Sequence, residues 1–217
     1  DLYQKFGSLG VLGQTVKSHG GSGTSNLAYG LVAYEFEKID SSYRSSISVQ
    51  SSLVIHPINE FGSQEQKDKY LPQLIKGEKI GCFGLTESEA GSDPASMKTL
   101  FKKTKDGYIL NGSKNWITNA PIADIFIIWA IEENKDYKSI KGFIIEKNTE
   151  GLNTSTIENK TSLKISPTGQ IILNNVFIPN NLCLENTEGW KSVFSCLNKA
   201  RFGISWGVLG SASECWL

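Results

Sequence analysis

Cysteine and histidine are both scarce in this chain of 217 residues, which contains four cysteines and two histidines. Zinc sites are usually built from cysteine pairs in C-x-x-C spacing together with further cysteines or histidines. No such pair occurs among the four cysteines, which are Cys82, Cys183, Cys196 and Cys215. We therefore expect no metal centre, and this pattern favours a reducing, intracellular environment.

Net charge is also lacking, because 22 lysines and arginines balance 22 aspartates and glutamates. Nucleic-acid-binding domains usually carry a basic excess, so we predict no nucleic-acid partner. No apolar run approaches the roughly 18–20 residues that a membrane-spanning helix needs, which predicts no membrane span. With 39% hydrophobic and 20% charged residues, the composition is typical of an ordinary globular protein.

The spacing of apolar residues predicts a helical N-terminal part over residues 1–78. Apolar side chains recur near a 3.6-residue period over residues 27–39, and further helices are expected over 47–55 and about 65–75. Ser25 or Asn26 can cap the first of these helices, and Lys76 followed by Gly77 is a typical helix end.

Residues 79–188 have a different pattern, in which short β-type runs are separated by Asn, Gly and Asp. Such spacing predicts a small antiparallel barrel or sandwich. A helical period returns over residues 189–217. The chain ends there on apolar residues without a cap, which predicts that it is a fragment. The fold class expected is therefore a multidomain α+β protein.

Two polar segments within the β part are candidates for a binding site. Residues 81–93 begin with an apolar run and end in a Gly-Ser-Asp turn, and residues 111–119 contain Asn-Gly followed by Trp-Ile-Thr. Hydroxyls and exposed backbone N–H groups can hold a flat cofactor, and an aromatic side chain can cover its face. The alternative is that both are plain turns, since Asn111-Gly112 is a common hairpin signal.

A group of charges lies between the first two predicted helices. Asp40 and Arg44 are four residues apart, which allows a local ion pair. Glu37 and Arg44 are seven apart, which places them on nearly the same face if the helix is continuous.

These motifs together resemble the acyl-CoA dehydrogenase family. The resemblance is carried by Leu85-Thr86-Glu87 before Gly91-Ser92-Asp93, and by Asn111-Gly112 before Trp116-Ile117-Thr118. It covers essentially the whole chain. It implies part of an N-terminal helical domain (1–78), a complete central β domain (79–188) and the first helix of a truncated C-terminal bundle (189–217).

Within the family, residues 35–45, 48–57, 81–87 and 196–204 are most similar to the glutaryl-CoA dehydrogenases. This similarity implies FAD-dependent oxidative decarboxylation of glutaryl-CoA to crotonyl-CoA, a step of lysine and tryptophan degradation. Two alternatives stay open. One is a short-chain acyl-CoA dehydrogenase acting on a monocarboxylyl thioester, and the other is a non-catalytic module that keeps the fold.

The resemblance also implies roles for individual residues. The FAD site would comprise Phe83, Leu85, Thr86, Gly91, Ser92, Trp116, Ile117 and Thr118. The substrate site would comprise Ser92 again, with Glu37, Arg44 and Ser45 at a distal carboxylate and Cys196, Asn198, Arg201 and Gly203 along the pantetheine channel. The family's general base is a glutamate in a segment absent from this sequence, so no catalytic residue is assigned, and Glu87 is expected to be structural.

The same resemblance implies an electron-transferring flavoprotein as acceptor and a homotetramer as the assembly. The expected location is the mitochondrial matrix in a eukaryote or the cytoplasm in a bacterium.

Overall fold

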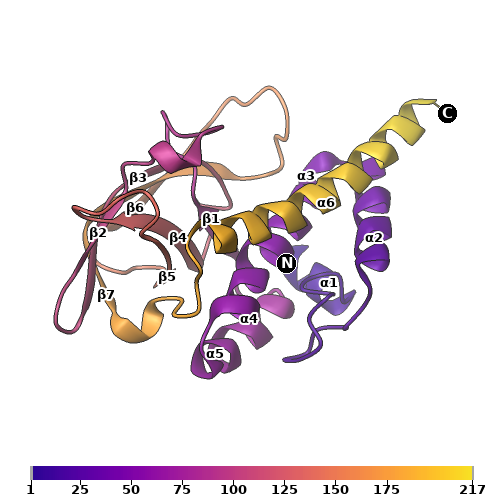
Figure 1. The fold of residues 1–217 in the computed structure, drawn as a ribbon. Helices are drawn as coiled ribbons and strands as arrows, with labels where there is room; N and C mark the ends of the chain where they lie inside the picture. The colour runs from indigo at the N-terminus through magenta and orange to yellow at the C-terminus, as the bar shows by residue number, and fades with distance from the viewer. Residues whose placement is uncertain (1, 217) are drawn as a thin grey trace.

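The computed structural model describes residues 2–216 and consists of a group of helices, a curled sheet and a long final helix (Figure 1). The sheet lies at one end of the molecule and the helices at the other. The N-terminal helical segments are α1 (Leu2–Ser8), α2 (Asn26–Ile39), α3 (Ser41–Ser48), the π-helix η1 (Val49–Ile55), α4 (His56–Phe61) and α5 (Gln64–Ile75).

The helix boundaries follow the capping residues of the sequence. The Ser25 hydroxyl accepts a hydrogen bond from the Ala28 amide at 3.2 Å and caps α2, as predicted. Ser63 and Gln66 form a reciprocal capping box at the start of α5. That helix ends before Gly77, whose φ of +70° is readily accessible only to glycine.

The helix that begins at Asn26 is not continuous through Arg44. Asp40 is extended, with φ −165° and ψ 129°, and its Oδ1 accepts from the Ser42 amide at 2.6 Å. The carboxylate therefore caps α3. Within the described residues it forms no ion pair with Arg44, so the suggested local pair between them is wrong.

The predicted helix over residues 47–55 combines the end of α3 with the π-helix η1. Its wider turn is visible where the His56 amide donates to the Ser51 carbonyl, five residues back. π-Helical turns are rare and occur frequently at functional sites. The sequence contained no signal for this change of helix type.

The β part forms one seven-stranded sheet, which confirms the α+β fold class. Its strands are β1 (Gly81–Gly84), β2 (Leu100–Lys103), β3 (Gly107–Thr118), β4 (Ile125–Glu132), β5 (Ile140–Glu146), β6 (Leu152–Thr156) and β7 (Thr168–Pro179). The order is β1-β4-β2-β3-β7-β6, with β5 also paired to β4. Both β1 and β2 pair with β4 in parallel, so the sheet is mixed and not antiparallel throughout.

Asn111 and Gly112 do not form the hairpin turn that the sequence indicated. Both lie inside β3, which pairs with β7 on either side of them with a register shift between Leu110 and Gly112. Gly112 is needed because an added Cβ would lie 2.5 Å from Oγ1 of Thr99 on the neighbouring chain segment. The dipeptide therefore forms a bulge at a close backbone approach.

Two short 3-10 helices, η2 (Pro94–Ser96) and η3 (Asn180–Leu182), precede the final helix α6 (Trp190–Trp216). Helix α6 runs from the sheet across α2 and α3 (Figure 1). The core beneath it joins helices and sheet, since Val54, Trp129 and Val193 belong to one buried cluster. None of the helices within residues 2–216 has the length and apolar character needed to cross a bilayer.

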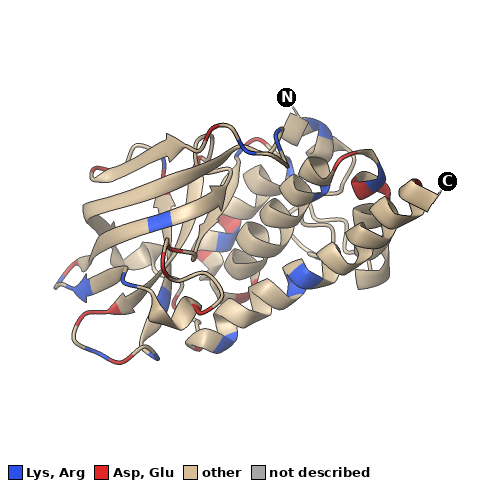
Figure 2. Ribbon diagram, turned by 90° about the horizontal axis from the view of Figure 1, so that it is seen from above, with Lys and Arg blue, Asp and Glu red and all other residues tan. Residues whose placement is uncertain are grey.

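Positions of lysine, arginine, aspartate and glutamate are distributed over both the helical and the sheet parts (Figure 2).

Candidate functional site

Two adjoining cavities open where the sheet meets η1 and α6. The smaller has a volume of about 160 Å³ and the larger about 560 Å³. Leu85, Thr86 and Leu197 line both of them, so the two cavities meet at these side chains. All eight residues predicted to hold a flavin line one cavity or the other. The smaller contains Phe83, Leu85, Thr86, Trp116, Ile117 and Thr118, and the larger contains Gly91 and Ser92 as well as Leu85 and Thr86.

The facing walls of the smaller cavity are the end of β1 and the end of β3. They are joined by a backbone hydrogen bond of 2.9 Å from the Asn115 amide to the Thr86 carbonyl. Trp116 follows with φ +59°, a left-handed conformation that is uncommon outside glycine. Its side chain remains 59% exposed. Such strained residues with accessible side chains are concentrated at functional sites.

Sequence reasoning missed the third wall of the smaller cavity. It is formed by Val49 and Leu53 of η1 and by Leu197 of α6. These residues look like ordinary core positions in an apolar helix, and only their packing beside β1 exposes them to the cavity.

The larger cavity lies between the loop over residues 91–95 and the start of α6. Its lining includes three aromatic residues that no sequence motif indicated, Tyr137, Trp190 and Phe194. Trp190 Nε1 donates to the Tyr137 carbonyl at 2.7 Å, which ties α6 to the loop after β4. Asp93 caps η2 by accepting from the Ala95 amide at 3.2 Å. The lining of the cavity thus combines apolar side chains with the polar residues Thr86, Ser92, Asp93 and Arg201.

The predicted channel residues on α6 occupy different positions. Arg201 lines the larger cavity, and its Nη1 donates to Oδ1 of the exposed Asn198 at 3.1 Å. Cys196 is fully buried and lines neither cavity. Burial raises the pKa of its thiol to about 12, so it stays protonated and unreactive. Gly203 also faces inward, against the hydroxyl of Tyr29.

Glu37 and Arg44 form an ion pair across the break between α2 and α3, from Nε to Oε2. Both side chains are largely buried, with 5% and 12% exposure respectively. Neither lines the two cavities described above. The connection to the smaller cavity runs through the backbone, because the amide of Val49, which lines that cavity, donates to the carbonyl of Ser45, the residue after Arg44.

The lining chemistry fits a flat heteroaromatic cofactor. The smaller cavity combines apolar walls with the hydroxyl-bearing Thr86 and Thr118 and an accessible indole at Trp116. A few polar groups set in an apolar pocket orient such a ligand. No group of three or more metal-binding side chains occurs within residues 2–216.

Comparisons with known proteins agree with this architecture. Residues 1–78 match the model of the acyl-CoA dehydrogenase N-terminal domain, and residues 82–176 match that of the acyl-CoA dehydrogenase middle domain. A short-chain-specific acyl-CoA dehydrogenase of Clostridium acetobutylicum is 36% identical over 212 residues, covering 96% of this chain and 56% of that protein. The chain thus spans about half the length of the curated relatives it matches.

Solved structures are similar over almost the entire chain. A glutaryl-CoA dehydrogenase of Mycobacterium smegmatis in complex with FADH2 is 44% identical with a TM-score of 0.95, covering 98% of this chain and 54% of that one. Butyryl-CoA dehydrogenase of Megasphaera elsdenii is 35% identical with a TM-score of 0.89, and the match covers 98% of this chain and 57% of that one. The two domain matches and these likenesses show that the chain belongs to the acyl-CoA dehydrogenase family.

Proposed function

We propose that this chain supplies the flavin-binding and thioester-binding walls of an FAD-dependent glutaryl-CoA dehydrogenase. The substrate assignment rests on how the guanidinium of Arg44 is bonded. Within residues 2–216, the acceptor bonded to its guanidinium is Glu37, through Nε. Its two terminal nitrogens have no hydrogen-bond acceptor among the described residues, and guanidinium can bind a carboxylate through two such nitrogens. Arg44 lines neither cavity, so the proposal requires the distal end of the acyl chain to extend beyond them toward α3.

The chemistry that bound FAD would supply is acceptance of a hydride from the β carbon of the thioester. The walls at Leu85-Thr86 and Trp116–Thr118 would hold its ring system, with Thr86 and Thr118 as hydrogen-bonding groups and Trp116 covering one face. Family membership and the FADH2 complex of the mycobacterial relative support this cofactor.

The larger cavity is the proposed place of the thioester and its pantetheine arm. Its apolar lining includes Trp190, Phe194 and Leu197, and Ser92 and Arg201 supply polar contacts. A cavity that combines apolar walls with a few polar groups suits a chain with occasional amide groups.

Glu37 would hold Arg44 in place for the distal carboxylate of a glutaryl group, with Ser45 beside it. Dehydrogenation between the α and β carbons, followed by loss of that carboxyl group as CO2, gives crotonyl-CoA, a reaction of lysine and tryptophan degradation. No carboxylate of this chain is assigned as the base. Glu87 is engaged in a buried ion pair with Lys114.

A short-chain acyl-CoA dehydrogenase is the second candidate, favoured by the similarity to the clostridial and Megasphaera proteins. In that case the substrate has no distal carboxylate, and Arg44 serves only as the partner of Glu37. A non-catalytic module is the third candidate, and the convergence of all eight predicted flavin residues on adjoining cavities argues against it.

We further propose an electron-transferring flavoprotein as acceptor and a homotetramer as the assembly. The proposed location is the mitochondrial matrix for a eukaryotic source and the cytoplasm for a bacterial one.

To test this proposal, the gene product that carries this sequence is mixed anaerobically with glutaryl-CoA or butyryl-CoA. The visible absorbance of its flavin is then measured over time. Rapid bleaching by glutaryl-CoA alone supports the proposal, and bleaching by butyryl-CoA alone favours the short-chain enzyme. Arg44→Gln is expected to lower kcat/KM for glutaryl-CoA by roughly a hundredfold, since a lost charge-assisted contact costs about 2–3 kcal/mol. Lys38→Gln, at a partly exposed lysine nearby, is the matched control.

A further inference from the structure

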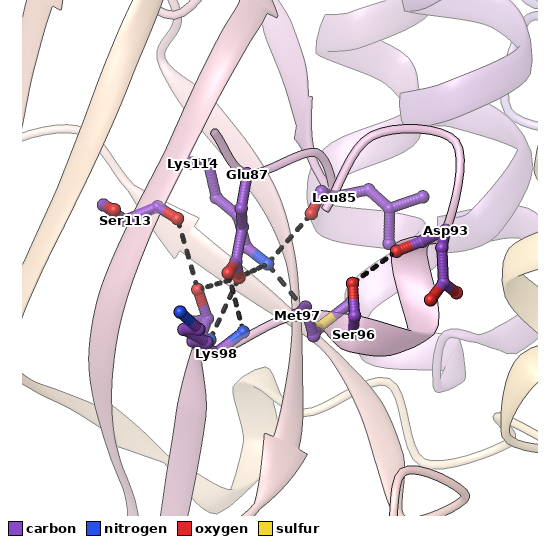
Figure 3. A network of polar contacts seen from close by, with 9 residues as sticks. Leu85, Glu87, Asp93, Ser96, Met97, Lys98, Ser113 and Lys114 are labelled. Carbon is purple, nitrogen blue, oxygen red and sulfur yellow. Dashed lines mark hydrogen bonds and ion pairs between the residues drawn. The ribbon is translucent and has the colours of Figure 1, made fainter. Parts of the chain in front are cut away.

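A buried ion pair between Lys114 and Glu87 joins β3 to the loop that follows β1 (Figure 3). Neither residue lines the smaller cavity, but each adjoins one of its walls in the chain. The Lys114 side chain has no solvent exposure. Its ammonium donates to Oε1 of Glu87 at 2.9 Å and to the Leu85 carbonyl at 3.0 Å, and it contacts Sδ of Met97 at 3.6 Å. One lysine on β3 therefore binds both the side chain and the backbone of the opposite loop.

The Glu87 carboxylate has a complete set of donors. In addition to Lys114, Oε1 accepts from the Thr99 amide at 3.0 Å and the Thr99 hydroxyl at 2.5 Å, and Oε2 accepts from the Lys98 amide at 2.6 Å. Burial acts to raise the pKa of this carboxyl, but Lys114 and these hydrogen bonds outweigh burial and lower it. The carboxylate thus stays charged and fixed between β3 and the segment before β2.

The contacts of this pair reach the cavity walls directly. Leu85, whose carbonyl accepts a hydrogen bond from Nζ of Lys114, lines both cavities. On the other wall, Asn115 follows Lys114 and donates to the Thr86 carbonyl, and Trp116 comes next with its left-handed backbone. A displacement of Lys114 or Glu87 would therefore change the separation of the two walls.

Stability alone does not explain why charged residues occupy this position. Burying an ion pair carries a desolvation penalty, and apolar residues of similar volume often stabilise a core equally well or better. Charged groups with several directional hydrogen bonds can instead specify one geometry.

We propose that Glu87 and Lys114 are positioning residues that set the gap between the Leu85-Thr86 wall and the Trp116–Thr118 wall, and thereby determine how tightly the flat cofactor is held. The inference rests on the proposed function, since it concerns the same cavity. It assigns neither residue a contact with the reacting atoms.

The experiment compares four forms of the gene product that carries this sequence: wild type, Glu87→Gln, Lys114→Met and the double variant Glu87→Gln/Lys114→Met. For each, the FAD dissociation constant, thermal unfolding, and hydrogen exchange in peptides covering residues 85–87 and 113–118 are measured. Both single variants should weaken FAD binding at least tenfold and accelerate exchange in both peptides.

The double variant separates positioning from stability. It removes the unpaired buried charge, so its unfolding temperature should recover toward the wild-type value while FAD affinity stays at least tenfold weakened. Recovery of stability and affinity together would overturn the proposal, because the pair would then act only by stabilising the fold. Unchanged exchange and affinity in the single variants would overturn it as well.

The control is Glu146→Gln, which removes the partner of Lys69 and Tyr70 between α5 and β5. It should lower the unfolding temperature without changing FAD affinity. If wild type fails to take up FAD, the proposed function fails, and the exchange measurement still decides the inference. Exchange that stays fast in the double variant while its unfolding temperature recovers would support it, and recovery of both to wild-type values would overturn it.

Discussion

Gly207 of α6 packs so closely on the carboxylate of Glu37 that a Cβ at position 207 would lie 2.8 Å from Oε2. The same Cβ would lie 3.2 Å from Nε of Arg44. The long final helix thus covers the ion pair that we propose for carboxylate recognition, and it does so only because position 207 has no side chain.

Gly207→Ala is therefore expected to displace the Glu37 carboxylate and to raise KM for glutaryl-CoA, with little effect on folding. The carboxylate can move, and alanine favours helices by about 1 kcal/mol over glycine. Gly210→Ala is the comparison, because its Cβ would lie 2.1 Å from the backbone oxygen of Tyr34. Backbone cannot move so easily, and we expect a loss of roughly 1–3 kcal/mol in urea unfolding. Equal losses from the two variants would contradict this account.

Trp116 should be unfavourable for folding and favourable for flavin binding. Its left-handed backbone costs roughly 1–2 kcal/mol, and its exposed ring recovers little through packing. Trp116→Asn, a residue that tolerates this conformation, should leave the flavin-free protein at least as stable as wild type. Trp116→Val should destabilise it, since a β-branched residue is poorly accommodated there. Both variants should bind FAD more weakly, and wild-type affinity in Trp116→Asn would argue against the proposed role of the indole.

His56 should make the fold sensitive to mild acid. Burial, followed by the positive charge of Lys199, lowers its pKa from 6.5 to about 4. Between these values the unfolded chain binds a proton that the folded chain does not, so the free energy of unfolding falls as the pH decreases through this window. The loss is at most about 3 kcal/mol. The free energy of urea unfolding is measured for wild type and His56→Gln from pH 7 to pH 4. If it changed with pH in the same way in both proteins, His56 would not be the source of the acid sensitivity.

Gln50 connects three elements through one buried amide. Its Nε2 donates to the carbonyls of Leu74 and Lys79 at 3.0 and 2.8 Å, and its Oε1 accepts from the Gly81 amide at 2.9 Å. Gln50→Leu leaves these backbone groups unpaired, and an unsatisfied buried group costs about 1–3 kcal/mol. We expect a destabilisation of roughly 3 kcal/mol in urea unfolding. Gln73→Leu, at a partly exposed glutamine of α5, should change stability by less than about 0.5 kcal/mol.

Several features of this protein could be predicted from the sequence because they depend on neighbouring residues. The cap of α2 at Ser25 and the end of α5 before Gly77 required only local chemistry. The order of helices, sheet and helix followed from the change in apolar period. The two polar segments at 81–93 and 111–119 were found through their motifs, and the structure brings residues of both to adjoining cavities.

Other features were decided only by the tertiary structure, because they depend on contacts between distant segments. Asn111 and Gly112 continue a strand and do not turn, since Thr99 lies against Gly112. Glu37 meets Arg44 across a helix break, in the place where continuous helical spacing was expected to align them. A local pattern records which side of its own helix or strand a residue occupies. A local pattern does not indicate which other element packs on that side. Such packing determined the third wall of the smaller cavity and the gap between its Leu85-Thr86 and Trp116–Thr118 walls.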